Sequence, residues 1–313
     1  MQMTGGARTD ASPVALHEPA PASFQYALTG PVTTFDPRVT AVRGDLADIA
    51  LAGRFFAPHY VAPQLRRCAP AITMLRAASA HDAQAVSQLI TGEGFALLDS
   101  AGDWGWGYCL IDGYCGYVLL NDLVETAALP THIVHARAAL VFADASIKAP
   151  TLDLLPMGAQ ITVAGESACG KFWQTGTGFV SKRHARSLAE PGTDPAIFAM
   201  QLTGAPYLWG GRSGDGLDCS GLVQLVMALT GHNAPRDSDQ QLEALGEFLA
   251  DDAPLQRGDL VFFPGHVGIM ADDTHLIHAN AHWMQVVTEP LADVIARFPE
   301  STPQPVLARK RIG

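Results

Sequence analysis

The sequence predicts a multidomain protein in which two small all-β barrels precede an α+β domain. The chain has 313 residues, which is more than one ordinary hydrophobic core holds. Hydrophobic residues make up 48% of it and charged residues only 16%, which is typical of folded domains and not of disordered ones. Short strand-like runs fill its middle, and an apolar helix with further strands follows them. These observations define the predicted fold class.

Four segments are expected along the chain. Residues 1–68 form an N-terminal arm, because their beginning is rich in Ala, Pro, Gly, Ser and Thr and lacks periodicity. Apolar residues at helical spacing predict one short helix at 42–53 within this arm. The two barrels are expected at 69–128 and 131–189, and the α+β domain at 191–313.

The two barrels are predicted from an internal repeat. Strand-like runs occur in the same order in both segments, and each set closes on Gly-aromatic-Val, first from Gly116 and then from Gly178. The aromatic residues of the first unit either fill its core or contact a ligand. They are Trp104, Trp106, Tyr108, Tyr114 and Tyr117.

Charge and cysteine usage exclude some partners. A formal net charge of -11 leaves no basic stripe that could follow a phosphate backbone, so nucleic acid is not an expected partner. Five widely spaced cysteines in a chain of this size predict free thiols and no disulfide framework. No run is apolar or long enough for a signal peptide or a membrane span, which predicts a cytoplasmic protein. A start site chosen downstream of a true signal would look the same.

Cys219 is the candidate nucleophile. It follows a glycine-rich loop and Asp218, and it begins an apolar helix that Gly231 is placed to end. Unpaired N–H groups and the positive end of the helix dipole favour a thiolate there, and the same N–H groups could hold an oxyanion. A cysteine among apolar residues can also be a plain buried side chain, so its partners decide the interpretation.

Two histidines downstream are the predicted partners of this thiol. Three strand-like runs follow the helix, and pairing Met270 with Thr274 across a tight turn places His266 opposite His278. Directly paired side chains share one face, so one imidazole could take the thiol proton while the other orients it. His275 is out of phase with this face. The alternative is a hairpin carrying two ordinary polar histidines.

A metal site is another use of the same three side chains. Cys219, His266 and His278 could ligate zinc, but the short paired spacings typical of structural zinc sites are absent. No metal or cofactor is therefore expected.

Five motifs in order resemble the NlpC/P60 family, papain-like cysteine peptidases that cut peptidoglycan stem peptides. They are PYLWGG, DCSG, PRDSDQQ, GDLVFF-x-GHVGI and HLIHAN. The resemblance implies an α+β papain-like catalytic domain with Cys219 as nucleophile, His266 as base and His278 as the orienting third residue. It also implies that Tyr207, in PYLWGG, helps to line the oxyanion side.

The barrels resemble bacterial SH3-like domains, and the whole order resembles the γ-D-glutamyl-L-diamino acid endopeptidases, also called dipeptidyl-peptidase VI. In that subgroup a tyrosine of the first SH3-like domain and the aspartate before the nucleophile hold a free amine, which implies Tyr114 and Asp218 here. A buried ammonium needs such a carboxylate. Asp82 is a candidate for a second acidic group. Ser220, by its backbone, and Ser238 match positions that bind the D-glutamate carboxylate, and Ser238 could also cap the following helix.

These resemblances imply a cysteine endopeptidase that hydrolyses the γ-D-Glu to diamino acid bond, with DAP or Lys, in murein peptides with a free N-terminal L-Ala. With no export signal, its expected role is peptide recycling inside the cell. Two alternatives stay open, namely a wall-remodelling endopeptidase acting on intact peptidoglycan and a non-catalytic wall-binding protein. Transfer of the acyl group to an amine in place of water is a third alternative. The sequence predicts neither DAP over Lys nor an oligomeric state.

Overall fold

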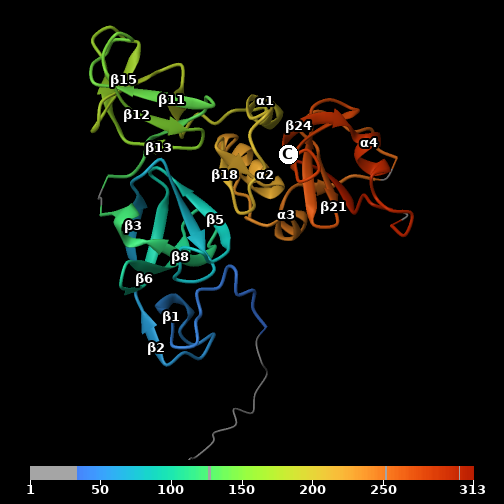
Figure 1. Ribbon diagram of the computed structural model, residues 1–313, viewed down its shortest axis with the longest axis horizontal. Helices are drawn as coiled ribbons and strands as arrows, with labels where there is room; N and C mark the ends of the chain where they lie inside the picture. The colour runs from blue at the N-terminus through green and yellow to red at the C-terminus, as the bar shows by residue number, and fades with distance from the viewer. Residues whose placement is uncertain (1–33, 126–127, 251, 303) are drawn as a thin grey trace, which may run out of the picture. The chain divides into compact units, whose positions relative to one another are not determined.

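The computed structural model describes residues 34–125, 128–250, 252–302 and 304–313. The chain divides into two units, Met1–Thr34 and Phe35–Gly313, and every element below belongs to the second. Residues 1–33 of the expected N-terminal arm lie outside the described residues. Figure 1 colours the chain from blue at the N-terminus to red at the C-terminus and labels many of its elements.

An extended segment replaces the short helix expected at 42–53. It contains strand β1 (Leu46–Asp48), one 3-10 turn η1 (Ile49–Leu51) and then strand β2 (His59–Val61), which pairs with β1 in parallel. Leu46 is buried with Trp106 of the next sheet, whereas the 3-10 turn is largely exposed. The prediction of a helix is wrong, because the segment buries extended residues against that sheet and no helical face.

Seven strands form the next sheet, in the order β5-β4-β8-β7-β6-β3-β9, with antiparallel neighbours. They are β3 (Gln64–Cys68), β4 (Ile72–Arg76), β5 (Ala85–Ile90), β6 (Gly94–Ala101), β7 (Trp104–Cys109), β8 (Cys115–Leu119) and β9 (Leu123–Val124), with a 3-10 turn η2 (Leu120–Asp122) before the last. All the strands predicted here form, and β3 begins before the expected domain start. Leu75, Phe95 and Val118 lie in the core of this sheet.

The following segment contains two sheets. One has the order β12-β11-β16-β15-β14 and the other β13-β10-β17. The strands are β10 (His132–Val134), β11 (Ala138–Phe142), β12 (Thr151–Pro156), β13 (Gln160–Ile161), β14 (Val163–Glu166), β15 (Phe172–Thr175), β16 (Phe179–Ser181) and β17 (Ala185–Ser187). The five-stranded order repeats β5-β4-β8-β7-β6 of the preceding sheet, and the Val of each Gly-aromatic-Val motif is fully buried. The repeat in sequence is thus a repeat in topology.

The remaining segment combines helices with a six-stranded sheet of order β20-β25-β21-β22-β23-β24. The strands of this sheet are β20 (Glu247–Phe248), β21 (Leu260–Phe263), β22 (His266–Met270), β23 (His275–Asn280), β24 (Gln285–Pro290) and β25 (Ala308–Arg311). Strands β18 (Arg212–Ser213) and β19 (Gly216–Leu217) form a separate two-stranded sheet in the same segment. Its helices are α1 (Pro195–Gln201), α2 (Cys219–Leu229), α3 (Ser238–Ala244) and α4 (Leu291–Ala296). Helix α2 packs against β22 and β23, which brings the start of the helix to the histidine-bearing strands.

A buried arginine joins this segment to the seven-stranded sheet. Arg212 of β18 pairs with Glu93 at 2.9 Å, and its main-chain and side-chain N–H groups donate to Gln88 of β5 at 2.7 Å. All three residues are almost fully buried. Strands β5 and β18 lie side by side as a result, also in Figure 1. The loops of the sheet are therefore held in a fixed position beside α2.

Candidate active site

Cys219 begins helix α2, as the sequence predicts. Asp218 is the N-cap, and its Oδ1 accepts the N–H of Gly221 at 2.7 Å, which fixes the first turn. The helix starts directly under the glycine-rich loop, since a Cβ on Gly221 would lie 2.1 Å from the carbonyl oxygen of Gly211. Cys219 is 7% exposed and lies at the edge of a cleft.

The thiol is not a preformed thiolate. Burial and the neighbouring Asp218 charge raise the pKa of Cys219 to about 11, and the N–H groups of Val267 and Ser220 offset only part of this. The helix start predicts a lowered pKa for the Cys219 thiol. This prediction is wrong, because the effect of burial on the pKa outweighs the effect of the helix N-terminus. The contact with Val267 places the sulfur beside the strand that begins at His266.

His266 and His278 form a hydrogen-bonded pair. Nε2 of His266 lies 2.7 Å from Nδ1 of His278. The expected register was wrong by two residues, because a longer loop in which Ala271 N–H donates to His275 pairs Met270 with Leu276 and not with Thr274. A shift of two keeps both histidines on one face, so they meet diagonally.

His266, the candidate base, is a neutral imidazole. Burial and the adjacent His278 lower the pKa of His266 to about 3, and burial also lowers that of His278. Nε2 of His266 is hydrogen-bonded to His278, so Nδ1 is the ring nitrogen of His266 that can accept a proton. A protonated thiol beside a neutral imidazole requires proton transfer during attack, as in general-base catalysis.

Glu289 of β24 extends the pair, and no motif in the sequence points to it. Its Oε1 lies 2.8 Å from Nε2 of His278, and Arg297 and the indole of Trp283 also donate to its carboxylate. These donors lower the pKa of Glu289 to about 2, although burial opposes them. An ionised carboxylate only accepts, so Nε2 of His278 carries the hydrogen even though Asn280 lies 3.0 Å away. Nδ1 of His278 is then an acceptor and orients His266.

Replacing Glu289 by Gln is expected to lower kcat about ten- to a hundredfold, because the amide can donate to His278 and favour the wrong tautomer. The carboxylate raises the pKa of both histidines, so its loss lowers these pKa values and moves the acid limb of the pH–rate profile to lower pH. Steady-state kinetics across the acid range measure both effects. Glu300→Gln, at an exposed position, is the control. This role of Glu289 would be contradicted if both variants lowered kcat equally and neither moved the acid limb.

The cleft beside Cys219 encloses about 270 Å³. It brings together the predicted site residues Tyr114, Tyr207, Asp218, Ser220 and Ser238. It is also lined by Arg38, Gln84, Val86, Trp209, Cys219, Asp237, Asp239 and Gly265. Asp82, the suggested second acid, is not among these residues, and Gln84 of the same loop lies there in its place.

Asp218 has other partners than the expected amine. Both of its oxygens bind the guanidinium of Arg236, at 2.6 and 2.9 Å, and they also accept the N–H groups of Gly210 and Gly221. Asp218 and Arg236 are both buried. The carboxylate is therefore fully engaged in holding the start of α2, and the prediction that it supplies the charge for an ammonium is wrong.

Asp237 is the acidic group that sequence reasoning missed, although it stands directly before Ser238 in a motif already singled out. Its Oδ2 accepts from the hydroxyl of Tyr114 at 3.0 Å, while Oδ1 has no hydrogen-bond partner among the described residues. Burial and Asp237 raise the pKa of Tyr114, so its hydroxyl stays a donor. Asp237 is also the N-cap residue of α3, which places Ser238 inside the helix and corrects its expected capping role.

Tyr207 lies near the thiol. Burial and the nearby Cys219 raise the pKa of its hydroxyl to about 12, so this group is a hydrogen-bond donor at neutral pH. Its side chain is half-buried and lines the cleft with Cys219. This position suits stabilisation of a developing oxyanion.

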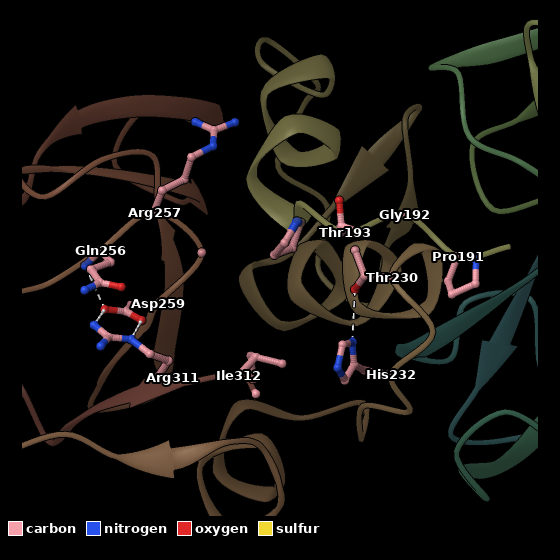
Figure 2. A pocket seen from close by; sticks show the side chains of 13 residues that line it. Pro191, Gly192, Thr193, Thr230, His232, Gln256, Arg257, Asp259, Arg311 and Ile312 are labelled. Atoms are coloured by element: carbon pink, nitrogen blue, oxygen red, sulfur yellow. Dashed lines mark hydrogen bonds and ion pairs between the residues drawn. The ribbon is translucent and has the colours of Figure 1, made fainter.

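A larger hollow of about 530 Å³ lies elsewhere on the same segment (Figure 2). Its polar side chains pair with one another, as Figure 2 shows for Asp259 with Arg311 and for Thr230 with His232. It contains no cysteine. Cys219, the candidate nucleophile, lines the smaller cleft instead.

Two features are absent from the described part of the chain. No cluster of three or more His, Cys, Asp or Glu side chains there could hold a metal ion. Within the same residues, helices are all too short or too polar to cross a membrane.

Several curated relatives resemble the chain. The dipeptidyl-peptidase 6 of Lysinibacillus sphaericus is 28% identical over 190 residues, covering 54% of this chain and 69% of the relative. The gamma-D-glutamyl-L-lysine dipeptidyl-peptidase of Bacillus cereus is 25% identical over 225 residues, covering 62% and 66%. The chain thus spans about two thirds of the length of these relatives.

A solved structure agrees in fold. An NlpC/P60 family protein from Bacillus cereus has a TM-score of 0.67 and 19% identity, covering 79% of this chain and 99% of that one. Family models match at 204–297, for the NlpC/P60 family, and at 75–123, for the bacterial dipeptidyl-peptidase SH3 domain. Residues 204–297 are therefore an NlpC/P60 family peptidase domain, and a bacterial SH3 domain precedes them in the chain.

Proposed function

We propose that the protein is a cysteine endopeptidase that hydrolyses the γ-D-Glu to diamino acid bond of murein stem peptides with a free N-terminal L-Ala. One observation carries the proposal, namely a short cleft with Cys219 at its edge and the Tyr114–Asp237 pair further along. The printed names of the relatives, a dipeptidyl-peptidase 6 and a gamma-D-glutamyl-L-lysine dipeptidyl-peptidase, support the same substrate class.

The reaction begins with proton transfer from Cys219 to Nδ1 of His266 as the sulfur attacks the γ-carbonyl of D-Glu. N–H groups at the start of α2 and the hydroxyl of Tyr207 stabilise the oxyanion. His266 then returns the proton to the leaving amine of the diamino acid. Water, activated by the same imidazole, hydrolyses the thioester and releases the dipeptide. His278 and Glu289 hold His266 in the tautomer that both half-reactions need.

The free amine of L-Ala binds at Asp237 in this proposal. Oδ1 of Asp237 is an unused acceptor, and a buried ammonium is costly unless a carboxylate meets it. Tyr114 orients the carboxylate through Oδ2. Ser238 and the backbone of Ser220 contact the α-carboxylate of D-Glu, because both line the cleft between Asp237 and Cys219.

Residues 131–189 form a second SH3-like barrel in this proposal. Its support is the strand order that this segment shares with the preceding sheet. The proposed architecture is then an N-terminal segment (1–68), two SH3-like domains (69–128 and 131–189) and a papain-like peptidase domain (191–313).

The proposed role is recycling of released murein peptides inside the cell, since a free amine at L-Ala exists only after the peptide has left the glycan. Purified protein incubated with L-Ala-γ-D-Glu-meso-diaminopimelate is expected to release L-Ala-D-Glu, and the lysine peptide tests the alternative diamino acid. Chromatography of the products measures release.

Two controls separate the alternatives. Peptide with an acetylated amine and intact peptidoglycan are both expected to be cleaved poorly. Cleavage of intact peptidoglycan in preference to the free peptide, with the protein in the wall fraction of cells, would replace recycling by wall remodelling. If none of these substrates is cleaved and the protein still binds the wall, the result would support a non-catalytic wall-binding protein.

A further inference from the structure

Arg38 joins three carboxylates at one end of the cleft. Its Nη1 donates to Asp237 at 2.8 Å, and its Nη2 lies 2.7 Å from both Asp36 and Asp239. The pKa of Arg38 is raised because Asp239 and Asp36 hydrogen-bond to it, so the guanidinium stays charged. These contacts fix the plane of the guanidinium in the cleft wall.

The segment that carries Arg38 is tied to both sides of the cleft. The carbonyl oxygen of Arg38 accepts the N–H of Cys115, next to Tyr114, at 2.7 Å. Asp36 accepts from Gln240 of α3 at 2.9 Å. The segment of Arg38 therefore connects the tyrosine loop with the peptidase domain.

A series of contacts links the nucleophile to Arg38. Cys219 adjoins Asp218, Asp218 binds Arg236, and the next residue, Asp237, binds both Tyr114 and Arg38. A peptide amine bound at Asp237 would lie beside the guanidinium, because Arg38 binds the same carboxylate and lines the same cleft as Cys219. A group attached to that amine would compete with the guanidinium for the space beside Asp237.

The charges around Arg38 are not balanced. Asp36, Asp237 and Asp239 face a single guanidinium, and Arg236 is already paired with Asp218. The surplus negative charge favours one more cation beside Arg38, and it disfavours a neutral or anionic group. The same cluster therefore attracts an ammonium and obstructs an extended chain.

We propose that Arg38 is a specificity-determining residue that closes the cleft beyond the substrate amine and so restricts the enzyme to peptides with a free N-terminus. This inference rests on the proposed function. It assigns the selection of substrate ends to a residue outside both domains that the family models match. Removing the side chain opens the cleft while leaving Tyr114, Asp237 and the reacting groups in place.

The test compares kcat/KM for two peptides, L-Ala-γ-D-Glu-meso-diaminopimelate and its N-acetylated form, in the wild type and in Arg38→Ala and Arg38→Lys. Arg38→Ala is expected to lower the preference for the free amine about tenfold or more, chiefly through faster cleavage of the acetylated peptide. Arg38→Lys, which keeps the charge but not the planar fork, is expected to retain part of the preference. A gain of activity cannot result from partial unfolding.

Arg43→Ala is the matched control. Arg43 belongs to the same N-terminal segment and pairs with Asp45 and Asp99, but it does not line the cleft. Its removal is expected to leave the preference unchanged. An unchanged preference in Arg38→Ala, or the same change in both variants, would overturn the inference while the proposed function stands. A wild type that cleaves neither peptide would instead refute the proposed function, and the inference with it.

Discussion

Replacement of Cys219 by alanine is expected to lower peptide hydrolysis about a thousandfold or more, because no other group can form the acyl intermediate. The variant with serine at the same position is expected to be nearly as inactive. A hydroxyl is harder to deprotonate than a thiol, and the surroundings of His266 suit proton transfer from a thiol. Product release from the free-amine peptide, followed by chromatography, measures both. Turnover retained by either variant would contradict the covalent mechanism.

Cys169→Ala is the control for that experiment. Cys169 is exposed, and hydrogen bonds from Ser167 and the backbone of Lys171 lower its pKa, whereas burial raises that of Cys219. Simple alkylating reagents are therefore expected to label Cys169 first, without loss of activity. Labelling speed alone does not identify the nucleophile here. Loss of activity on modification of Cys169 would contradict the assignment.

Replacement of Arg236 by methionine is expected to reduce the free energy of unfolding by about 3–5 kcal/mol, because it leaves a buried carboxylate without its cation. Arg236 and Asp218 are both almost fully buried, and Arg236 also donates to Ser87 of β5 and to the hydroxyl of Ser220. Urea unfolding followed by circular dichroism measures the change. The start of α2 would loosen at the same time, so activity falls as well.

The double variant Arg236→Met with Asp218→Asn is the control. It removes the stranded charge while keeping a side chain that can cap α2, so it is expected to recover part of the lost stability. A double variant as unstable as the sum of the two single changes would show that the pair is not coupled. Arg43→Met, at a more exposed ion pair, is expected to cost much less.

The local parts of this protein could be predicted from its sequence. Strand alternation and turn residues predicted the strands around Cys109 and Phe179, and the cap, apolar face and following glycine predicted the helix at Cys219. The two histidines were placed on one face despite a register wrong by two residues, because the side-chain period of a strand is two. Periodicity tolerates this error, whereas exact pairing depends on a loop hydrogen bond that composition does not encode.

Contacts between distant segments could not be predicted. Arg236 engages Asp218, Glu289 engages His278, and Arg38 engages Asp237, and each pairing depends on how separate elements pack. The prediction of a lowered pKa for the Cys219 thiol was wrong for the same reason, since the burial of Cys219 depends on the tertiary structure. A charged residue in a sequence shows that a partner is needed but not which one it is.

The buried pairing of Arg212 with Glu93 and Gln88 ties the seven-stranded sheet to the peptidase domain. Tyr114 reaches Asp237 from that sheet, so the proposed nucleophile and the proposed end recognition draw on different segments of one compact unit. Mutations in the segments before residue 191 could therefore alter which peptides are accepted without disturbing the nucleophile. Evolution could diversify substrate choice in this enzyme by exchanging what precedes residue 191, while the bond-breaking apparatus stays constant.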